Sequence, residues 1–307
     1  MLGFFLLGVS AGLLVTGAEL FAENASAAGR RLGISGFAVG LLLAGAEPEE
    51  LVTAVIAALR DRPGIAAGDA VGANVTMLTL VLGLAALARP VPMHRGVRPY
   101  AAGAALLGAL AGVIVRDGTV GRAEGAVLVL AYAGFVALVW LRERRPPAIG
   151  EVPETLEHNV SEGAGRGLLL VLVGIAVMAA GGRLAVAGAE RIAETLDVAD
   201  SAVGLTFVAL ATTAELLALV WAAARRQLEE LAVAGVLGSV AYNATVTLGG
   251  AALARPLTTG GVGGAAVAAA AIPLALMLAS VRSGQLTRAA GVMLVGGYGA
   301  YLIVAIA

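Results

Sequence analysis

The sequence contains no cysteine and no lysine, and it has only two histidines in 307 residues. Without thiols, neither a disulfide nor a thiolate metal site can form. His94 and His158 lie far apart in the chain, so we do not expect a histidine-based catalytic or metal centre either. Charged residues make up only 13% of the chain, against about 25% in soluble domains. These absences argue against a water-soluble enzyme.

Long uncharged runs dominate the rest of the sequence. Hydrophobic residues make up 59% of the chain, and the mean hydropathy is +0.93. Several runs reach the roughly 17–25 apolar residues that cross a bilayer core of about 30 Å. The first run has no positive charge before it and no clear cleavage site after it, so we expect a retained span rather than a signal peptide. We therefore predict an all-α polytopic membrane protein with about ten transmembrane helices. The predicted spans cover residues 2–22, 33–59, 66–88, 98–115, 122–141, 167–189, 198–224, 230–254, 259–281 and 289–306.

One polar segment, residues 142–166, divides these spans into two sets of five. It reads "RERRPPAIGEVPETLEHNVSEGAGR" and has two consecutive prolines and no apolar run. We predict an N-terminal repeat over 1–141, a linker over 142–166 and a C-terminal repeat over 167–307. The odd-numbered loops contain about twice as many arginines as the even ones, which by the positive-inside rule places the linker in the cytoplasm and the N-terminus outside. The expected location is a prokaryotic plasma membrane.

The two halves resemble each other in sequence. Residues 30–60 and 194–225 both contain "AVGL", then a polar interruption ending in Glu-Leu, then an uncharged stretch and an arginine. The segments "LGLAALARPV" at 82–91 and "LGGAALARPL" at 248–257 close the spans that follow. Because each half has an odd number of spans, the second half must be inverted relative to the first. Inverted repeats are typical of secondary transporters, whose sites lie between the repeats near the bilayer midplane.

Acidic residues interrupt one of the most apolar stretches, "LLLAGAEPEELV" at 41–52. Glu50 precedes Arg60 by about ten residues, as Glu215 precedes Arg225, and this length of helix spans about 15 Å, half of the bilayer core. A charge at the midplane costs at least about 2.5–3.5 kcal/mol. We therefore expect both glutamates to face an internal cavity, one from each repeat.

Pro48 is expected to break the helix around residues 44–48. Proline lacks a backbone N–H, and its ring clashes with the carbonyl four residues earlier. Carbonyl groups freed inside a membrane are tolerated only where they line a protected or wet cavity. We therefore expect carbonyls near Gly45 to be cation ligands, together with those near Ala211 in the second half, where Thr212 adds a hydroxyl.

The spans that follow add further oxygen and amide groups, from Asp69 and Asn74 in the first half and from Ser239 and Asn243 in the second. A central site built from oxygen atoms with two or more carboxylates suits a hard cation, since Ca²⁺ binds about 6–8 such oxygens. The expected partners are inorganic cations and the lipid bilayer, without nucleic acid. We expect no bound cofactor, and the sequence leaves the oligomeric state open.

The repeats resemble those of the cation/Ca²⁺ exchanger superfamily. Each half of that family carries an "A-x-G-T-S-x-P-E-L" helix followed by "G-N-x-x-G-S-N-x-x-N", and the resemblance covers nearly the whole chain, including "GAELFAENASAAGRRLGIS" at 17–35. It implies the inverted-repeat fold and cation exchange rather than enzymatic activity. It also implies that Glu50 and Glu215 are the cation-binding glutamates, with Gly45 at the glycine of the first motif.

Several positions depart from the family pattern. The Thr-Ser of the first motif is Ala46-Glu47 here, and Asp69 stands in place of an asparagine. In the second half Ser239 and Asn243 remain, while Thr212 stands where the family has serine. These changes remove hydroxyls and amides that bind Na⁺ in the family and add acids that can carry protons.

We therefore expect antiport of Ca²⁺, or a related divalent cation, for H⁺ by alternating access, with Glu47 as a second acid on the same helix face as Glu50. Two alternatives remain open. One is Na⁺-coupled Ca²⁺ exchange, and the other is a non-transporting membrane scaffold or sensor derived from an exchanger.

Most candidate residues also have a purely structural interpretation. Glu49 is expected to point away from Glu50 on a regular helix and to be an interface partner, unless the break at Pro48 turns it inward. Asp69 could be only a helix N-cap, and buried asparagines often serve as interhelical hydrogen bonds. Glu19 and Arg183, at matching positions of the repeats, could form a gate pair, although extension of both side chains to the membrane interface is the simpler expectation.

Overall fold

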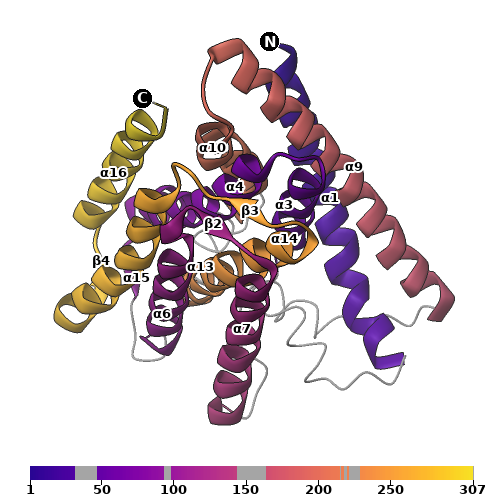
Figure 1. Ribbon diagram of the computed structural model, residues 1–307. Helices are drawn as coiled ribbons and strands as arrows, with labels where there is room; N and C mark the ends of the chain where they lie inside the picture. Colours follow the sequence, from indigo (N-terminus) through magenta and orange to yellow (C-terminus); the bar gives the residue numbers. More distant parts are fainter. Residues whose placement is uncertain are drawn as a thin grey trace.

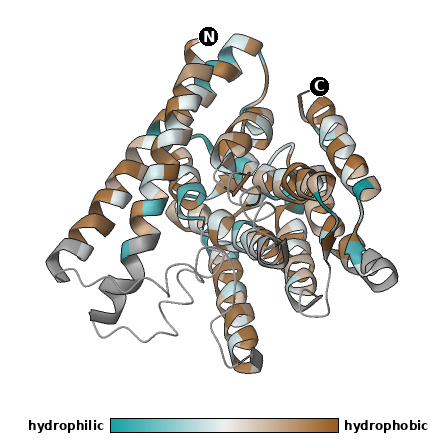
Figure 2. Ribbon diagram, turned by 180° about the vertical axis from the view of Figure 1, so that it is seen from behind, coloured by the Kyte–Doolittle hydropathy of each residue, from teal (hydrophilic) through white to brown (hydrophobic). Residues whose placement is uncertain are grey.

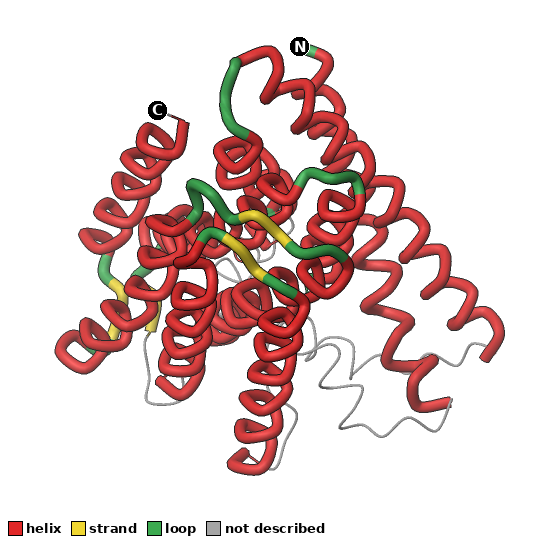
Figure 3. Tube along the Cα trace, in the orientation of Figure 1, coloured by secondary structure: helices red, strands yellow, loops and turns green. Residues whose placement is uncertain are grey.

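The computed structural model describes residues 1–31, 47–92, 98–143, 164–214, 216, 217, 220 and 229–306. This part of the chain is almost entirely helical, with four very short strands (Figure 1, Figure 3). The α-helices are α1 (Leu2–Arg31), α3 (Pro48–Leu59), α4 (Pro63–Thr76), α5 (Leu82–Ala88), α6 (Arg98–Ile114), α7 (Arg122–Glu143), α9 (Ala164–Leu196), α10 (Asp200–Val203), α11 (Ala209–Thr212), α13 (Glu229–Tyr242), α14 (Leu248–Ala254), α15 (Gly263–Ser283) and α16 (Arg288–Ile306). The other elements are the π-helices η1 (Met77–Val81), η3 (Gly204–Val208) and η4 (Asn243–Thr247), the 3₁₀-helix η2 (Val115–Asp117), and the strands β1 (Val91–Pro92), β2 (Thr119–Val120), β3 (Leu257–Thr258) and β4 (Gln285–Leu286).

The helices confirm the all-α polytopic membrane architecture. Seven segments of the described chain are long and apolar enough to cross a membrane, and Asp200–Thr212 and Gly263–Leu276 are shorter apolar helices. Hydrophobic residues cover the outer helices (Figure 2), where large side chains such as Phe5, Leu106 and Met293 are exposed. Such exposure is unfavourable in water and is expected where the surrounding medium is lipid.

Two helices extend past their predicted spans, although the part of α1 that is apolar enough to cross a membrane, Leu2–Phe21, agrees with the first predicted span. The first was expected to end at residue 22 and the sixth to cover 167–189, but α1 continues to Arg31 and α9 runs from Ala164 to Leu196. Their sequences keep favouring helix past the apolar run, since "AENASAAGRR" and "AERIAETL" are rich in alanine and other good helix formers.

The centre of the molecule consists of two interrupted helices, α4–η1–α5 and α13–η4–α14. Most of their described side chains are buried, and most of their residues are alanine, valine or leucine. Each contains a π turn at the matching place, so the two halves share an irregularity that is rare in helices in general and frequent at functional sites. The interruption lies beside the polar residues predicted for the cation site.

Reciprocal glycine contacts relate the two halves. A Cβ at Gly291 in α16 would lie 2.8 Å from the carbonyl oxygen of Gly83 in α5, and one at Gly249 in α14 would lie 2.6 Å from that of Gly125 in α7. Gly83 and Gly249 hold the same position in the two matching segments, and Gly125 and Gly291 follow them at the same distance along the chain. Each half therefore contacts the other through the same surface, as in a twofold-related pair.

The short strands repeat this reciprocity. β1 pairs antiparallel with β4, with Val91 opposite Leu286, and β2 pairs antiparallel with β3, with Val120 opposite Leu257. Each two-stranded sheet thus takes one strand from each half.

The first helix of each half confirms that the repeats are inverted. α1 and α9 lie side by side (Figure 1), with Gly3 against Gly188 and Gly17 against Gly174. Residue numbers rise along one helix as they fall along the other, so the two helices are antiparallel. Equivalent helices that run in opposite directions require that one repeat be upside down relative to the other.

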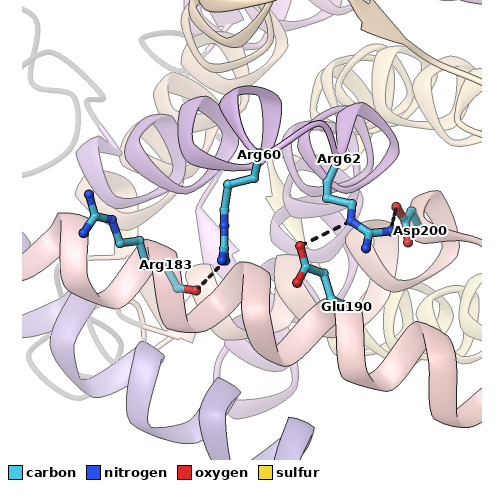
Figure 4. A network of polar contacts seen from close by, with 5 residues as sticks. All are labelled: Arg60, Arg62, Arg183, Glu190 and Asp200. Carbon is cyan, nitrogen blue, oxygen red and sulfur yellow. Dashed lines mark hydrogen bonds and ion pairs between the residues drawn. The ribbon is translucent and has the colours of Figure 1, made fainter.

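The turn between α3 and α4 is tied to α9 and α10 by arginines (Figure 4). Arg62 forms ion pairs with Glu190 at 3.2 Å and with Asp200 at 3.3 Å, and Arg60 donates a hydrogen bond to the carbonyl of Arg183 at 3.5 Å. Burial opposes the charge of Arg62, but the carboxylates of Asp200 and Glu190 outweigh it and raise the pKa of Arg62 above its ordinary value.

The suggested gate pair does not form among the described residues. The side chains of Glu19 and Arg183 are both exposed, and no ion pair joins them there. Extension of each side chain toward the membrane interface therefore remains the better account of both.

Candidate cation site

Glu50 lies in the first turn of α3. The helix begins at Pro48, the position where proline is best tolerated because its missing N–H would have no partner in any case, and Glu47 precedes it as N-cap with φ −111° and ψ 74°. A helix start at Pro48 agrees with the predicted break. The expectation that Glu47 shares a helix face with Glu50 was wrong, because Glu47 lies outside the helix.

The second half has its interruption at the matching place. α11 ends at Thr212, and Thr213 leaves helical geometry with φ −78° and ψ 3°. Ala211 is half-buried in the last turn of α11. Two predicted ligands, Gly45 and Glu215, lie outside the described residues.

Two acid–hydroxyl contacts join the halves across this region. The Ser239 hydroxyl in α13 donates a hydrogen bond to the Glu47 carboxylate. The Thr212 hydroxyl in α11 donates to the Asp69 carboxylate in α4 at 3.1 Å, and it also lies 3.2 Å from the carbonyl of Val208. The predicted candidates Glu47, Ser239, Asp69 and Thr212 thus meet in two pairs.

Asp69 is not an N-cap. α4 begins at Pro63 with Arg62 as its N-cap, so Asp69 lies well inside the helix and its side chain is fully buried. The structural interpretation of Asp69 as a capping residue was therefore wrong.

Several buried polar atoms in the described region have no hydrogen-bond partner. They include both carboxylate oxygens of Glu50, Oδ2 of Asp69, Oδ1 of Asn74 and Nδ2 of Asn243. Buried polar groups are normally satisfied, so each exception requires an explanation such as a bound ion or water. Glu50 is 0% exposed, and the charged groups that act on it are Glu47 and Asp69, both of the same sign.

Asn243 faces Glu50 from the start of η4. It contacts the Glu50 side chain without reaching full hydrogen-bond geometry. Its Oδ1 accepts a hydrogen bond from Thr247 at 2.8 Å, which directs the amide nitrogen away from Thr247. Asn243 thus lies beside Glu50, and its predicted role as a cation ligand stays a prediction.

Glu49 is a residue that the sequence analysis undervalued. Its side chain is buried and lies close to that of Glu47. Its carboxylate also interacts electrostatically with Tyr242. The ring of Tyr242 packs edge-on against Tyr132, with centroids 5.5 Å apart. The sequence feature that indicates this is Pro48. Because the helix starts there, the side chains of Glu47 and Glu49 on either side of the break can lie close together.

The described acids alone do not form a complete metal centre. Among the residues that the structure describes, no three His, Cys, Asp or Glu side chains are arranged to hold one ion. The available donors are the fully buried carboxylates of Glu50 and Asp69 and their neighbouring hydroxyl, amide and carboxylate groups, all of them hard ligands of the kind that bind Ca²⁺ and not soft metals.

Comparisons with known proteins agree with this geometry. The family described as "Sodium/calcium exchanger protein" matches residues 2–141 and 166–307. "Uncharacterized membrane protein MJ0091" of Methanocaldococcus jannaschii is 30% identical over 77% of this chain and 76% of its own length. "Inner membrane protein YrbG" of Escherichia coli K12 is 27% identical over 93% of this chain and 91% of its own length.

Solved structures of the sodium-calcium exchanger NCX_Mj have the same fold. The form soaked with 100 mM Na⁺ and 10 mM Sr²⁺ has a TM-score of 0.65 and 26% identity over 98% of both chains. The form soaked with 2.5 mM Na⁺ and 0.1 mM Ca²⁺ has a TM-score of 0.64 and 25% identity over 98% of this chain and 97% of that one.

Proposed function

Since the chain belongs to the sodium/calcium exchanger protein family, a family of membrane cation exchangers and not enzymes, we propose that it exchanges Ca²⁺, or a related divalent cation, for H⁺. The observation that supports this most is Glu50, a fully buried carboxylate whose two oxygens have no hydrogen-bond partner. A buried charge that lacks protein partners is costly unless a cation or a proton neutralises it.

Glu50 and Glu215 are the proposed cation ligands, one from each repeat. Asn74, Asp69 and the carbonyls near Gly45 and Ala211 are proposed to complete the oxygen set. Ser239 donates a hydrogen bond to Glu47, Thr212 donates one to Asp69, and Asn243 lies beside Glu50. Alternating access then carries the ion across, since an empty site with two or more charges cannot cross the barrier easily.

Three features favour H⁺ as the counter-ion. The hydroxyls of Ser239 and Thr212, which in this family pattern would be available to Na⁺, each donate to an acid. Glu47 and Glu49 are both buried and lie close together, and like charges held so close favour a proton on one of them. The like charges of Glu47 and Asp69 around Glu50 also favour neutralisation by protons when no divalent cation is bound.

Na⁺-coupled exchange is the second candidate function. It is favoured by the likeness to NCX_Mj, which is called a sodium-calcium exchanger and was studied with Na⁺, Ca²⁺ and Sr²⁺. A non-transporting scaffold or sensor is the third, and it predicts no ion-dependent change in the protein.

The proposed setting is a prokaryotic plasma membrane, with the N-terminus outside and residues 142–166 in the cytoplasm. Repeats over 1–141 and 167–307 on either side of this linker are part of the same proposal.

The deciding experiment is ⁴⁵Ca²⁺ uptake by proteoliposomes under a proton gradient alone and a sodium gradient alone. We expect uptake with the proton gradient and little with sodium, in excess over protein-free liposomes treated in the same way. Uptake only with sodium would establish the second function. Absence of uptake, together with no shift of the melting temperature by Ca²⁺, would establish the third.

A further inference from the structure

Two tyrosines of α16 point into the protein from a helix that otherwise faces outward. Tyr298 and Tyr301 are one turn apart, so they share one helix face, and their ring centroids lie 6.0 Å apart. Apart from Tyr298, the only buried residue of α16 is Gly291. The inward face of this helix is thus defined by the glycine contact with α5 and by the two tyrosines.

Tyr301 satisfies a carbonyl group that a π turn leaves without its usual partner. Its hydroxyl donates a hydrogen bond to the carbonyl oxygen of Leu205 at 2.7 Å. In an α-helix that oxygen would accept from the amide of Ala209, but this amide donates instead to the carbonyls of Gly204 and Thr206. A buried carbonyl that loses its amide partner needs another donor, and Tyr301 supplies it.

The same carbonyl lies at a close contact between α4 and η3. A Cβ at Gly72 would lie 2.3 Å from the Leu205 oxygen, so only glycine fits there. The Tyr298 hydroxyl lies near the Thr76 side chain of α4 without completing a hydrogen bond to it. One face of α16 therefore lies beside both α4 and η3 at the point where those two helices meet.

These two helices carry one of the acid–hydroxyl pairs. α4 holds Asp69 and Asn74, and η3 continues into α11, which ends at Thr212. The hydrogen bond from Thr212 to Asp69 joins the same two helical segments that Tyr298 and Tyr301 approach from α16. A shift of η3 against α4 would therefore change this pair first.

We propose that Tyr301, supported by Tyr298, is a positioning residue that sets the cation affinity of the site by fixing η3 and α11 against α4. It acts through Thr212 and Asp69 and does not touch the ion. The inference rests on the proposed cation site. It gives α16 a role in that site, although α16 supplies none of the proposed ligands.

The first half lacks the same device. Gly83 corresponds to Gly249, and the same offset makes Tyr298 correspond to Tyr132 and Thr76 to Tyr242. Tyr132 and Tyr242 also contact each other. Tyr301 corresponds to Phe135, which has no hydroxyl. Hydrogen bonding of a π-turn carbonyl from the fifth helix is therefore expected only in the second half.

The test is Tyr301→Phe, which removes one hydroxyl and keeps the ring. We expect the Ca²⁺ concentration for half-maximal ⁴⁵Ca²⁺ uptake to rise about fivefold, the usual size of the effect of one neutral hydrogen bond, with little change in maximal rate or in the melting temperature without Ca²⁺. Tyr100→Phe, at a buried tyrosine of α6, is the matched control and should leave the half-saturating concentration unchanged. Gly72→Ala, which forces the same carbonyl away, should raise it further.

A double variant separates positioning from general stabilisation. In a Thr212→Val background, Tyr301→Phe should change the half-saturating concentration by less than about twofold, because linked residues are not additive. Full multiplicative effects, or an unchanged half-saturating concentration in Tyr301→Phe, would overturn the inference while wild-type uptake stays intact. No Ca²⁺-dependent uptake by the wild type would instead reject the proposed function, and this inference with it.

Discussion

The two halves of the site make the same kind of contact with exchanged roles. In one pair the acid, Glu47, lies at the break before α3 and the hydroxyl, Ser239, lies on α13 of the other repeat. In the other pair the hydroxyl, Thr212, ends α11 and the acid, Asp69, lies on α4 of the other repeat. Each pair therefore has one acid and one hydroxyl, with both acids in the first repeat and both hydroxyls in the second.

This exchange shows that a twofold arrangement of functional groups does not require matching residues. Glu47 and Thr212 occupy corresponding places before their breaks, yet one accepts a hydrogen bond and the other donates it. Each acid receives its donor from the opposite repeat, so a movement of one repeat against the other would alter both pairs together. The predictions that follow test this equivalence, beginning with the largest expected effect.

Glu50→Gln and Glu215→Gln should abolish divalent cation transport to the same extent. A change in an outer-shell partner of a metal typically costs about 10–100-fold in affinity, so loss of a ligand should cost more than about a hundredfold. The measurement is ⁴⁵Ca²⁺ uptake by proteoliposomes, with Glu124→Gln, far along the sequence in α7, as the control. Near-normal uptake by either variant would contradict the proposed equivalence of the two glutamates.

Removing both additional acids should weaken proton coupling. In the double variant Glu47→Thr with Asp69→Asn, we expect uptake driven by a proton gradient to fall at least about tenfold, within the usual range of coupling between two ligands. Ca²⁺ binding should persist, because Glu50 and Glu215 remain. Thermal shifts with Ca²⁺ and uptake under separate gradients measure the two effects. A variant that keeps its full proton-driven uptake would show that other groups carry the protons.

The two donors should differ in importance. Ser239→Ala and Thr212→Val each remove one donor to a buried acid, which should weaken Ca²⁺ affinity by about 1 kcal/mol, or about fivefold. Ser239→Ala should have the larger effect, because the Thr212 hydroxyl divides its hydrogen bonding between Asp69 and the Val208 carbonyl. Thr16→Val, at an exposed threonine of α1, is the matched control. The opposite order of effects would contradict the assignment of Thr212 as the weaker donor.

The smallest effect is expected where ions pair at the ends of the central helices. Arg62→Ala removes two partly exposed ion pairs at the start of α4, worth about 0.2–1 kcal/mol each, and should lower the melting temperature slightly at low salt and less at high salt. Asp61→Ala, which removes the more exposed pair with Arg255 beside the end of α14, should change it less. Thermal unfolding in detergent at two salt concentrations makes the comparison. A larger effect of Asp61→Ala would reverse the assigned order.

The sequence predicted the part of the fold that depends on length and repetition. Apolar runs located the spans, matching segments located the symmetry-related helices, and Pro48 located the start of α3. The burial of Glu50 followed from its distance to Arg60. These features depend on one segment at a time, so local reasoning was sufficient for them.

The paired contacts could not be predicted in the same way. Counting residues along a regular helix assigned Glu47 to the face of Glu50 and left Glu49 outside the site, but the helix does not include Glu47. The π turns η1, η3 and η4 each insert an extra residue, which rotates everything beyond them relative to an α-helix. The pairing of Thr212 with Asp69 and of Tyr301 with Leu205 depends on those rotations and on which helices touch.

The short strands bear on how this chain is made. β1 belongs to the first half but pairs with β4 of the second half, and β2 of the first half likewise pairs with β3 of the second. During synthesis, the N-terminal half must therefore remain in the bilayer with strands β1 and β2 unpaired until the C-terminal half has been inserted. Two fragments divided within the linker and produced together would face the same assembly step, and they should be able to associate into the complete protein.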